Sequence, residues 1–347
     1  MWSFNATTEM SILKIDIHTH ILPENIPNWK EKFGYGGFIQ LDHYKPCCAK
    51  MLRDDGKFFR DIEENCWSPE TRIHECNQHQ VNVQVLSTVP IMFSYWTKPN
   101  DCLSISQFLN DHIANIVQQY PTKFIGLGTV PMQAPDFAIK ELERCKKIGL
   151  VGVQIGSNVN QENLGDIKFA DFFSACERLE MAVFVHPWEM LGEQHIQKYW
   201  LPWLVGMPAE VSRAICSLIF SGTLELLPKL RIAFAHGGGS FPSTIGRIDH
   251  GFHARPDLCA IDNNISPKNY LNKIYYDSLV HEPLILDYLV KLVGADRIAL
   301  GTDYPFPLGE LEPGKLIESM NYNDTIKERL LSGTALEWLN LDRNKFL

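Results

Sequence analysis

The sequence has no excess of basic residues. Its 347 residues include 32 lysines and arginines against 41 aspartates and glutamates, a formal net charge of −9 with histidine neutral. Nucleic acids and anionic membranes bind electropositive surfaces, so we expect neither of them as a partner. The acidity also provides no long-range attraction for an anionic small molecule, which local groups of a site must therefore hold.

The sequence also lacks the motifs of several other protein classes. Its nine cysteines form no Cys-x-x-Cys pair, which argues against a thiolate zinc site or a thioredoxin-type redox centre. The odd number of cysteines and the absence of a secretory leader pattern at the N-terminus predict reduced thiols and a cytosolic protein. No apolar run approaches the roughly 18 residues of a membrane-spanning helix, so we expect no membrane association.

Neither repeats nor low-complexity tracts nor long linkers interrupt the chain, which favours one continuous domain. A short apolar or β-branched run that ends at a polar residue recurs instead, as is typical of strands buried on both faces of a parallel sheet. Eight such runs cover residues 13–17, 81–86, 124–129, 151–155, 182–185, 231–235, 274–276 and 297–300.

Helix signals lie between these runs. Ser68-Pro69-Glu70 has the pattern of a helix start, and residues 136–147 and 284–293 are each followed closely by a glycine that can end a helix. Eight strands alternating with helices predict an α/β protein, a single (β/α)₈ TIM barrel. A doubly wound sheet is the alternative, but no Gly-rich dinucleotide-binding turn follows any of the runs.

Two segments are too long to be simple connections. Residues 23–67 form a small insertion after the first strand, and residues 188–212 separate the fifth strand from its helix and contain three tryptophans. In a barrel both insertions follow the carboxyl ends of strands, where substrates bind. We therefore expect both above the site, the second as a lid.

Residues that bind metal ions stand at the carboxyl ends of four predicted strands: His18 and His20, His186, His236, and Asp303. Any one buried histidine is more often a satisfied core residue, but five such residues at matching strand ends are hard to explain by chance. Neutral imidazole and carboxylate suit Zn²⁺, which lowers the pKa of a bound water to about 7. One of the five is then expected to be spared from coordination to act as a base.

This set resembles the amidohydrolase superfamily, and the wider sequence resembles the metal-dependent decarboxylase branch of that family. The resemblance covers residues 14–347, the barrel with its insertion, and leaves residues 1–13 as a non-catalytic extension. The stretches that carry it are residues 14–23, 33–37, 89–96, 199–208, 235–239 and 301–315.

The resemblance implies a role for each strand-end residue. It identifies the ligands of one zinc ion per subunit as His18, His20, His186 and Asp303. It identifies His236 as the catalytic base. Gln154 stands where dinuclear relatives carry a metal-bridging lysine, so a single ion is expected.

The resemblance also implies residues that contact the substrate. Arg60 matches a family arginine that holds a substrate carboxylate, and Arg247 matches one that the neighbouring subunit of a homodimer inserts. Taken alone, each arginine is better explained by an ion pair with a nearby acidic residue, and the resemblance reverses that preference. Trp203 and Phe306 are candidate walls of the pocket, although a core or lid-packing role explains them nearly as well.

The activity implied is zinc-dependent, non-oxidative decarboxylation of 2-amino-3-carboxymuconate 6-semialdehyde, a dicarboxylate of tryptophan and kynurenine catabolism. The product would be 2-aminomuconate 6-semialdehyde, with quinolinate and NAD formation limited as a result. An amidohydrolase-type hydrolase acting on a carboxylate substrate is the alternative, because it would use the same metal residues. A binding scaffold that has lost catalysis is disfavoured, since all five strand-end residues are intact.

Overall fold

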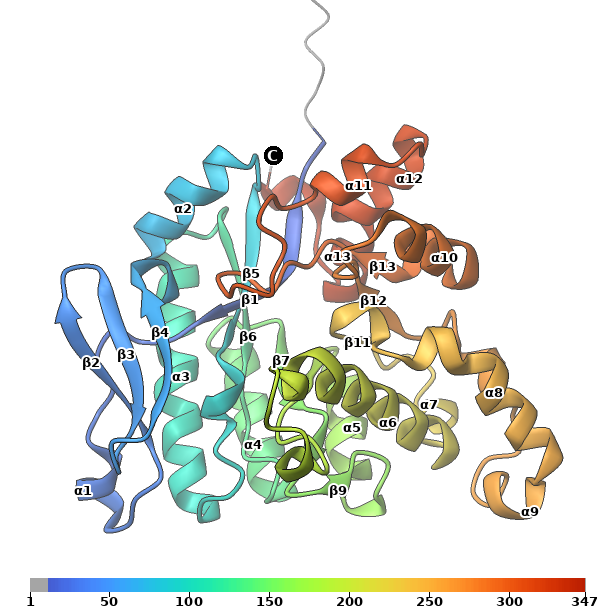
Figure 1. Cartoon of the computed structure of the whole chain (residues 1–347), viewed down its shortest axis with the longest axis horizontal. Coiled ribbons are helices and arrows are strands. Elements are labelled where there is room, and N and C mark those ends of the chain that lie inside the picture. Colours follow the sequence, from blue (N-terminus) through green and yellow to red (C-terminus); the bar gives the residue numbers. More distant parts are fainter. Residues whose placement is uncertain (1–11, 347) are drawn as a thin grey trace, which may run out of the picture.

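The computed structural model describes residues 12–346, and its centre is a barrel of eight parallel strands (Figure 1). In the order in which they pair, the strands are β1 (Ile15–Ile21), β5 (Val83–Thr88), β6 (Phe124–Gly128), β7 (Gly152–Gly156), β10 (Ala182–His186), β11 (Ile232–Phe234), β12 (Tyr275–Asp277) and β13 (Ile298–Ala299). Each overlaps one of the eight apolar runs. The predicted barrel is confirmed.

Helices follow the strands and cover the outside of the barrel. The longer ones are α2 (Pro69–Gln78), α3 (Pro99–Gln119), α4 (Pro135–Lys147), α5 (Ala170–Arg178), α6 (Met207–Phe220), α8 (Phe241–Ala254) and α10 (Pro283–Val293). The shorter ones are α1 (Trp29–Phe33), α7 (Thr223–Leu226), α9 (Pro256–Cys259), α11 (Lys315–Ser319), α12 (Asp324–Glu328) and α13 (Thr334–Leu339). The predicted helix start is present, because the Ser68 hydroxyl accepts a hydrogen bond from the Thr71 amide at 3.2 Å.

The barrel interior is filled by alternate residues of the strands, as expected from the two-residue period of a strand. Ile15 and Ile17 of β1 belong to this inner cluster, together with Phe184 of β10. Helix α13 closes one end of the barrel with the fully buried Trp338, whose ring centroid lies 5.9 Å from that of Phe184. Leu13 joins the same cluster, and the rest of the predicted extension, residues 1–11, lies outside the described residues.

The insertion after β1 is an independent small sheet, which we did not predict. Its antiparallel strands are β2 (Ile39–Lys45), β3 (Cys48–Arg53) and β4 (Phe58–Glu63), seen at the left of Figure 1. The Asp55-Gly56 pair between β3 and β4 is a hairpin signal, and Gly56 has a φ of +83°. The alternation of buried Ala49 and Met51 along β3 is a second signal that sequence analysis can use.

The insertion after β10 is shorter than predicted. Helix α6 begins at Met207 and directly continues a π-helical turn, Pro202–Gly206, so the helical backbone already starts within the predicted insertion. The stretch Pro202–Phe220, which includes α6, has a mean hydropathy of 1.3 over a membrane-spanning window. By length and composition alone it could cross a membrane, but Val211, Ile215 and Leu218 are buried in the core around the barrel, as in the core helix of a protein that does not span a membrane.

We predict that Trp338→Ala lowers the free energy of unfolding by about 3–5 kcal/mol, because it leaves a cavity beneath the barrel interior. Trp338→Phe should lose far less, since it keeps a ring against Phe184 and removes only the 3.3 Å bond from the indole N–H to the Arg231 carbonyl. Urea denaturation of both variants measures the difference. Equal midpoints for Trp338→Ala and the native chain would contradict this packing.

Candidate metal centre

A bulge in β1 turns two histidines toward the barrel mouth. Pairing of β1 with β5 shifts register between Asp16 and Thr19, which reverses the alternation that places Ile17 inside. His18 and His20 therefore point into the barrel, and His18 packs edge-on against Phe184 at a centroid distance of 4.9 Å. Their Nε2 atoms lie 3.2 Å apart.

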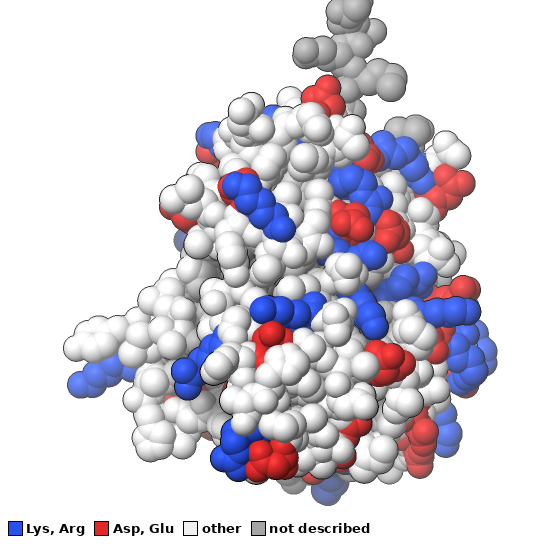
Figure 2. Space-filling view, turned by 90° about the vertical axis from the view of Figure 1, so that its right-hand side faces the viewer, with Lys and Arg blue, Asp and Glu red and all other residues white. Residues whose placement is uncertain are grey.

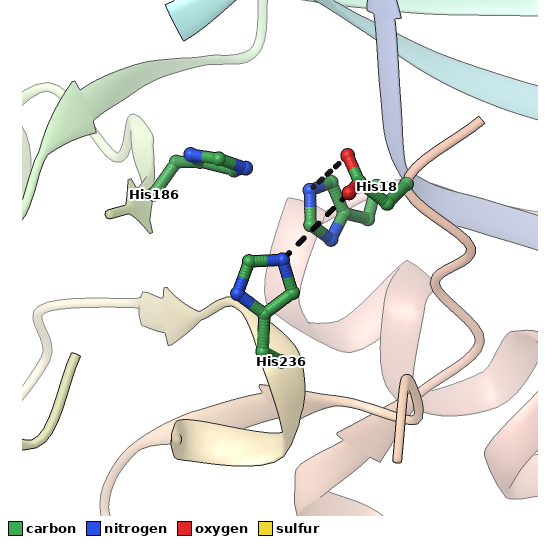
Figure 3. Close-up of side chains that lie close together, drawn as sticks. His18, His186 and His236 are labelled. Carbon is green, nitrogen blue, oxygen red and sulfur yellow. Dashed lines mark ion pairs between the residues drawn. The ribbon is translucent and has the colours of Figure 1, made fainter. Parts of the chain in front are cut away.

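The other strand-end residues converge on the same point (Figure 3). His186 ends β10, His236 follows β11, and Asp303 lies in the loop after β13. One potential ligand atom from each of His18, His186, His236 and Asp303 lies within 4.8 Å of the others. His20 is outside that mutual set, but its Nε2 lies 3.0 Å from Asp303 Oδ1, closer than the 3.4 Å of His18 Nε2.

Three of the imidazoles are held by hydrogen bonds at Nδ1. His18 Nδ1 lies 2.7 Å from Asp277 Oδ2, His20 Nδ1 lies 3.1 Å from the Thr88 carbonyl, and His186 Nδ1 lies 2.9 Å from the Pro187 carbonyl. Because these partners only accept, each Nδ1 carries a proton, and in the neutral form of each ring Nε2 is the nitrogen left free to bind a metal ion.

The chemistry of this donor set fits a divalent metal ion. Among the described residues, His186 Nε2 is buried without a hydrogen-bond partner. An unpaired buried nitrogen is costly, and a metal ion in contact with it would remove that cost. Imidazole nitrogens with one carboxylate are typical of zinc and of related transition metals.

The electrostatics of the centre favour the protonation states that metals bind. Burial lowers the pKa of His20, and burial together with the neighbouring imidazoles lowers the pKa of His186 well below its ordinary value. Burial alone raises the pKa of Asp303, but the surrounding histidines outweigh it and hold that pKa well below the usual range. These shifts favour neutral imidazoles at His20 and His186 and a charged carboxylate at Asp303.

His236 differs from the other three histidines. Burial lowers its pKa, but the nearby carboxylates of Asp303 and Asp277 outweigh burial and raise it above the ordinary value. Its Nε2 lies 3.9 Å from Asp303 Oδ2. A histidine whose proton is stabilised in this way can take up and return a proton near neutral pH.

Asp277 at the end of β12 organises the centre and was missed in the sequence. Besides His18, its buried carboxylate accepts hydrogen bonds from the amides of His236 at 2.9 Å and Gly237 at 2.7 Å. These bonds fix His236 with a φ of +58°, a left-handed conformation that costs about 1–2 kcal/mol. The strand-end rule that selected Asp303 applies equally to Asp277 and would have found it.

A pocket at the barrel mouth joins the centre to the predicted substrate residues. His20, His186 and Asp303 line it together with Arg60, Trp203 and Phe306. The Arg60 guanidinium carbon lies 4.2 Å from the centroid of the Phe306 ring. Burial lowers the pKa of Arg60, and the nearby Asp303 carboxylate partly opposes that shift. The structure places Arg60 beside the centre and not in an ion pair with Asp61 or Glu63 within the described chain.

Arg247 and Gln154, the two other positions singled out in the sequence, do not line this pocket. Arg247 is exposed on α8 and does not line the pocket of its own chain. Asp249, the ion-pair alternative for Arg247, instead contacts Lys268 at 3.2 Å. Gln154 accepts a 2.6 Å hydrogen bond from Ser87 and donates one of 2.9 Å to the Thr88 carbonyl that holds His20.

Comparisons with known proteins agree with this geometry. The amidohydrolase family profile matches residues 15–341. The chain is 59% identical to 2-amino-3-carboxymuconate-6-semialdehyde decarboxylase of Dictyostelium discoideum, over 96% of this chain and 94% of that protein. It is 40% identical to the protein of the same name from Caenorhabditis elegans, over 98% and 97%.

A solved structure shares the fold. Dihydroxybenzoic acid decarboxylase from Polaromonas, with bound manganese and an inhibitor, superimposes with a TM-score of 0.77. The two sequences are 20% identical, and the match covers 96% of this chain and 99% of that one.

We predict that Asp277→Asn weakens zinc binding by roughly 10–100-fold, the usual effect of removing a group that orients a metal-binding histidine. Competition with a chromophoric chelator measures the affinity. Asp287→Asn is the matched control, because Asp287 pairs with Lys291 on the outer helix α10 and should leave the affinity unchanged. Equal affinity in the native chain and Asp277→Asn would contradict the orienting role.

Proposed function

The chain belongs to the amidohydrolase family and is a decarboxylase, and we propose that it converts 2-amino-3-carboxymuconate 6-semialdehyde to 2-aminomuconate 6-semialdehyde and CO₂ with one zinc ion per subunit. The observation that carries the proposal is the set of histidines with bare Nε2 atoms, found in a chain 59% identical to a relative of that name. We place the reaction in cytosolic tryptophan catabolism, where it would limit quinolinate and NAD formation.

In this proposal the zinc ligands are His18, His20, His186 and Asp303. When bound, the ion supplies Lewis acidity that makes a water acidic near neutral pH. His236 is the alternative to His20 as a ligand, because one of its ring nitrogens lies within 4.8 Å of the potential ligand atoms of His18, His186 and Asp303. Two observations support its role as the base: its Nε2 is 3.9 Å from Asp303, farther than that of His20, and its pKa is raised by the nearby carboxylates after burial has lowered it.

The protein's own residues then account for proton movement and binding. His236 takes a proton from water at its imidazole and delivers it to the substrate carbon that bears the departing carboxylate, while the hydroxide left behind adds to the adjacent carbon of the conjugated system. The carboxylate then leaves as CO₂, its bonding electrons restore the double bond and expel the hydroxide, and a proton from solvent converts the hydroxide back to water. Arg60 binds a carboxylate of the substrate through its planar fork of donors. Trp203 and Phe306 enclose the pocket and exclude water from it.

The substrate carries a second carboxylate, and the pocket of one chain supplies Arg60 alone among the predicted arginines. We propose a homodimer in which Arg247 of one subunit enters the pocket of its neighbour. Its exposure on α8 supports this arrangement. Figure 2 shows lysines and arginines interspersed with acidic residues on the face at the right of Figure 1.

We predict that His236→Ala retains one zinc per chain but lowers turnover by about 10²–10⁴-fold, the usual contribution of a positioned base. His20→Ala and His186→Ala should instead lose zinc. Metal analysis and the decay of the substrate's ultraviolet absorbance measure the two properties. Wild-type turnover in His236→Ala, or a full zinc equivalent in His186→Ala, would show that the roles are wrongly assigned.

Mixing Arg247→Ala with His236→Ala should restore activity through hybrid dimers, because one of the two sites then has both an intact base and a partner's arginine. Random exchange of subunits predicts about one quarter of the native activity per chain. Arg60→Ala mixed with His236→Ala is the control and should give no rescue, since Arg60 and His236 serve the same chain's site. Absence of rescue in the first mixture would rule out the contribution in trans.

A further inference from the structure

The weakest junction of the barrel lies where β1 meets β13, and two predicted ligands flank it. Strand β13 is only Ile298–Ala299, and the chain after it approaches β1 through isolated contacts. The His20 amide donates to the Tyr304 carbonyl at 2.8 Å, and Tyr304 directly follows Asp303. The Ile17 amide donates to the Leu300 carbonyl at 2.8 Å, and Thr302 donates to the Asp16 carboxylate, so the distance between His20 and Asp303 depends on these few bonds.

The side chain of Arg72, from helix α2, lies buried at this junction. Amide and carbonyl of one strand residue point to the same side, so the His20 carbonyl also faces the junction, where β13 offers no partner. Arg72 Nη1 donates to that carbonyl at 2.7 Å and to the Asn65 carbonyl at 2.9 Å. Arg72 Nε donates to Gln84 Oε1 of β5 at 3.0 Å.

The flat face of the same guanidinium contacts the loop that carries Asp303. Its central carbon lies 4.6 Å from the centroid of the Tyr304 ring, within the range of a cation–π contact. The Tyr304 hydroxyl donates to Glu75 of α2 at 2.5 Å, which holds the ring against the same helix. The Arg72 side chain thus contacts His20, which is one predicted ligand, and Tyr304, which directly follows the predicted ligand Asp303.

Burying this cation is costly. Arg72 is 0% exposed, and among the described residues its Nη2 has no hydrogen-bond partner and no carboxylate forms an ion pair with it. Such burial is destabilising, and the hydrogen bonds to oxygen atoms and the contact with the Tyr304 ring offset only part of the cost. Only a guanidinium supplies in-plane donors for two strands together with a flat face for an aromatic ring.

We propose that Arg72 is a positioning residue of the metal centre, which holds His20 and Asp303 at ligand distance across the β1–β13 junction. The inference rests on the proposed function, since it presumes that these two residues bind one ion. A lysine at this position keeps the charge but loses the fork and the flat face. The relative position of the two ligands should then relax, and the ion should bind less tightly.

The test is a titration of the metal-stripped full chain with Co²⁺, whose visible absorption bands report the coordination geometry. Arg72→Lys should bind Co²⁺ roughly 10–100-fold more weakly and with shifted bands. Arg144→Lys is the matched control, because Arg144 of α4 pairs with Asp111 and Glu141 on the outside of the barrel. It should show the native affinity and spectrum, even if it loses stability.

Two substitutions of Tyr304 keep the proposal testable if Arg72→Lys does not fold. Tyr304→Phe retains the ring that faces Arg72 and should bind Co²⁺ with the native spectrum, whereas Tyr304→Leu should shift the bands in the direction of Arg72→Lys. Native affinity and bands in Arg72→Lys, or identical behaviour of the two Tyr304 variants, would overturn the positioning role alone. Failure of the native chain to bind Co²⁺ would overturn the metal centre itself, and this inference with it.

Discussion

The site depends on the hydrogen bonds that hold each imidazole at Nδ1. Asp277, the Thr88 carbonyl and the Pro187 carbonyl each accept a hydrogen bond from the Nδ1 of one histidine, so that the three Nε2 atoms are the nitrogens left to bind a cation. Such a cluster of lone pairs is unfavourable by itself and becomes favourable around a cation. The barrel supplies these partners from the ends of β5, β10 and β12, which are not adjacent in the sheet, and the arrangement therefore requires the fold as a whole.

The protein as a whole is acidic, whereas its proposed substrate site has to offer positive charge to a dicarboxylate. A net charge of −9 gives no steering toward a dicarboxylate, and the cations available to bind one are local. Arg60 lies in the pocket, and Arg247 is exposed on α8 and suited to a neighbouring subunit. Arg72, deeper in the fold, contributes through the backbone of His20 and lies behind the ligands, not among the groups that meet the substrate.

The barrel and the strand-end residues could be predicted because each depends on a local pattern. Apolar runs mark the strands, and polar residues at their ends meet at one mouth in any parallel barrel. The bulge between Asp16 and Thr19 could not be predicted, since it depends on pairing with β5. Asp277 could have been, by the same strand-end rule. The contacts of Arg72 depend on three elements far apart in sequence, and no local pattern marks them.

The most direct test of this account is the metal content of freshly purified protein, measured by mass spectrometry of the metals before any chelator is added. The Nε2 atoms of His18, His20 and His186, left free by their Nδ1 hydrogen bonds, and the carboxylate of Asp303 at the barrel mouth predict one equivalent of zinc per chain. One equivalent of zinc, released together with activity by a strong chelator and restored with it, would agree with the account. Active protein that contains no divalent transition metal would contradict it.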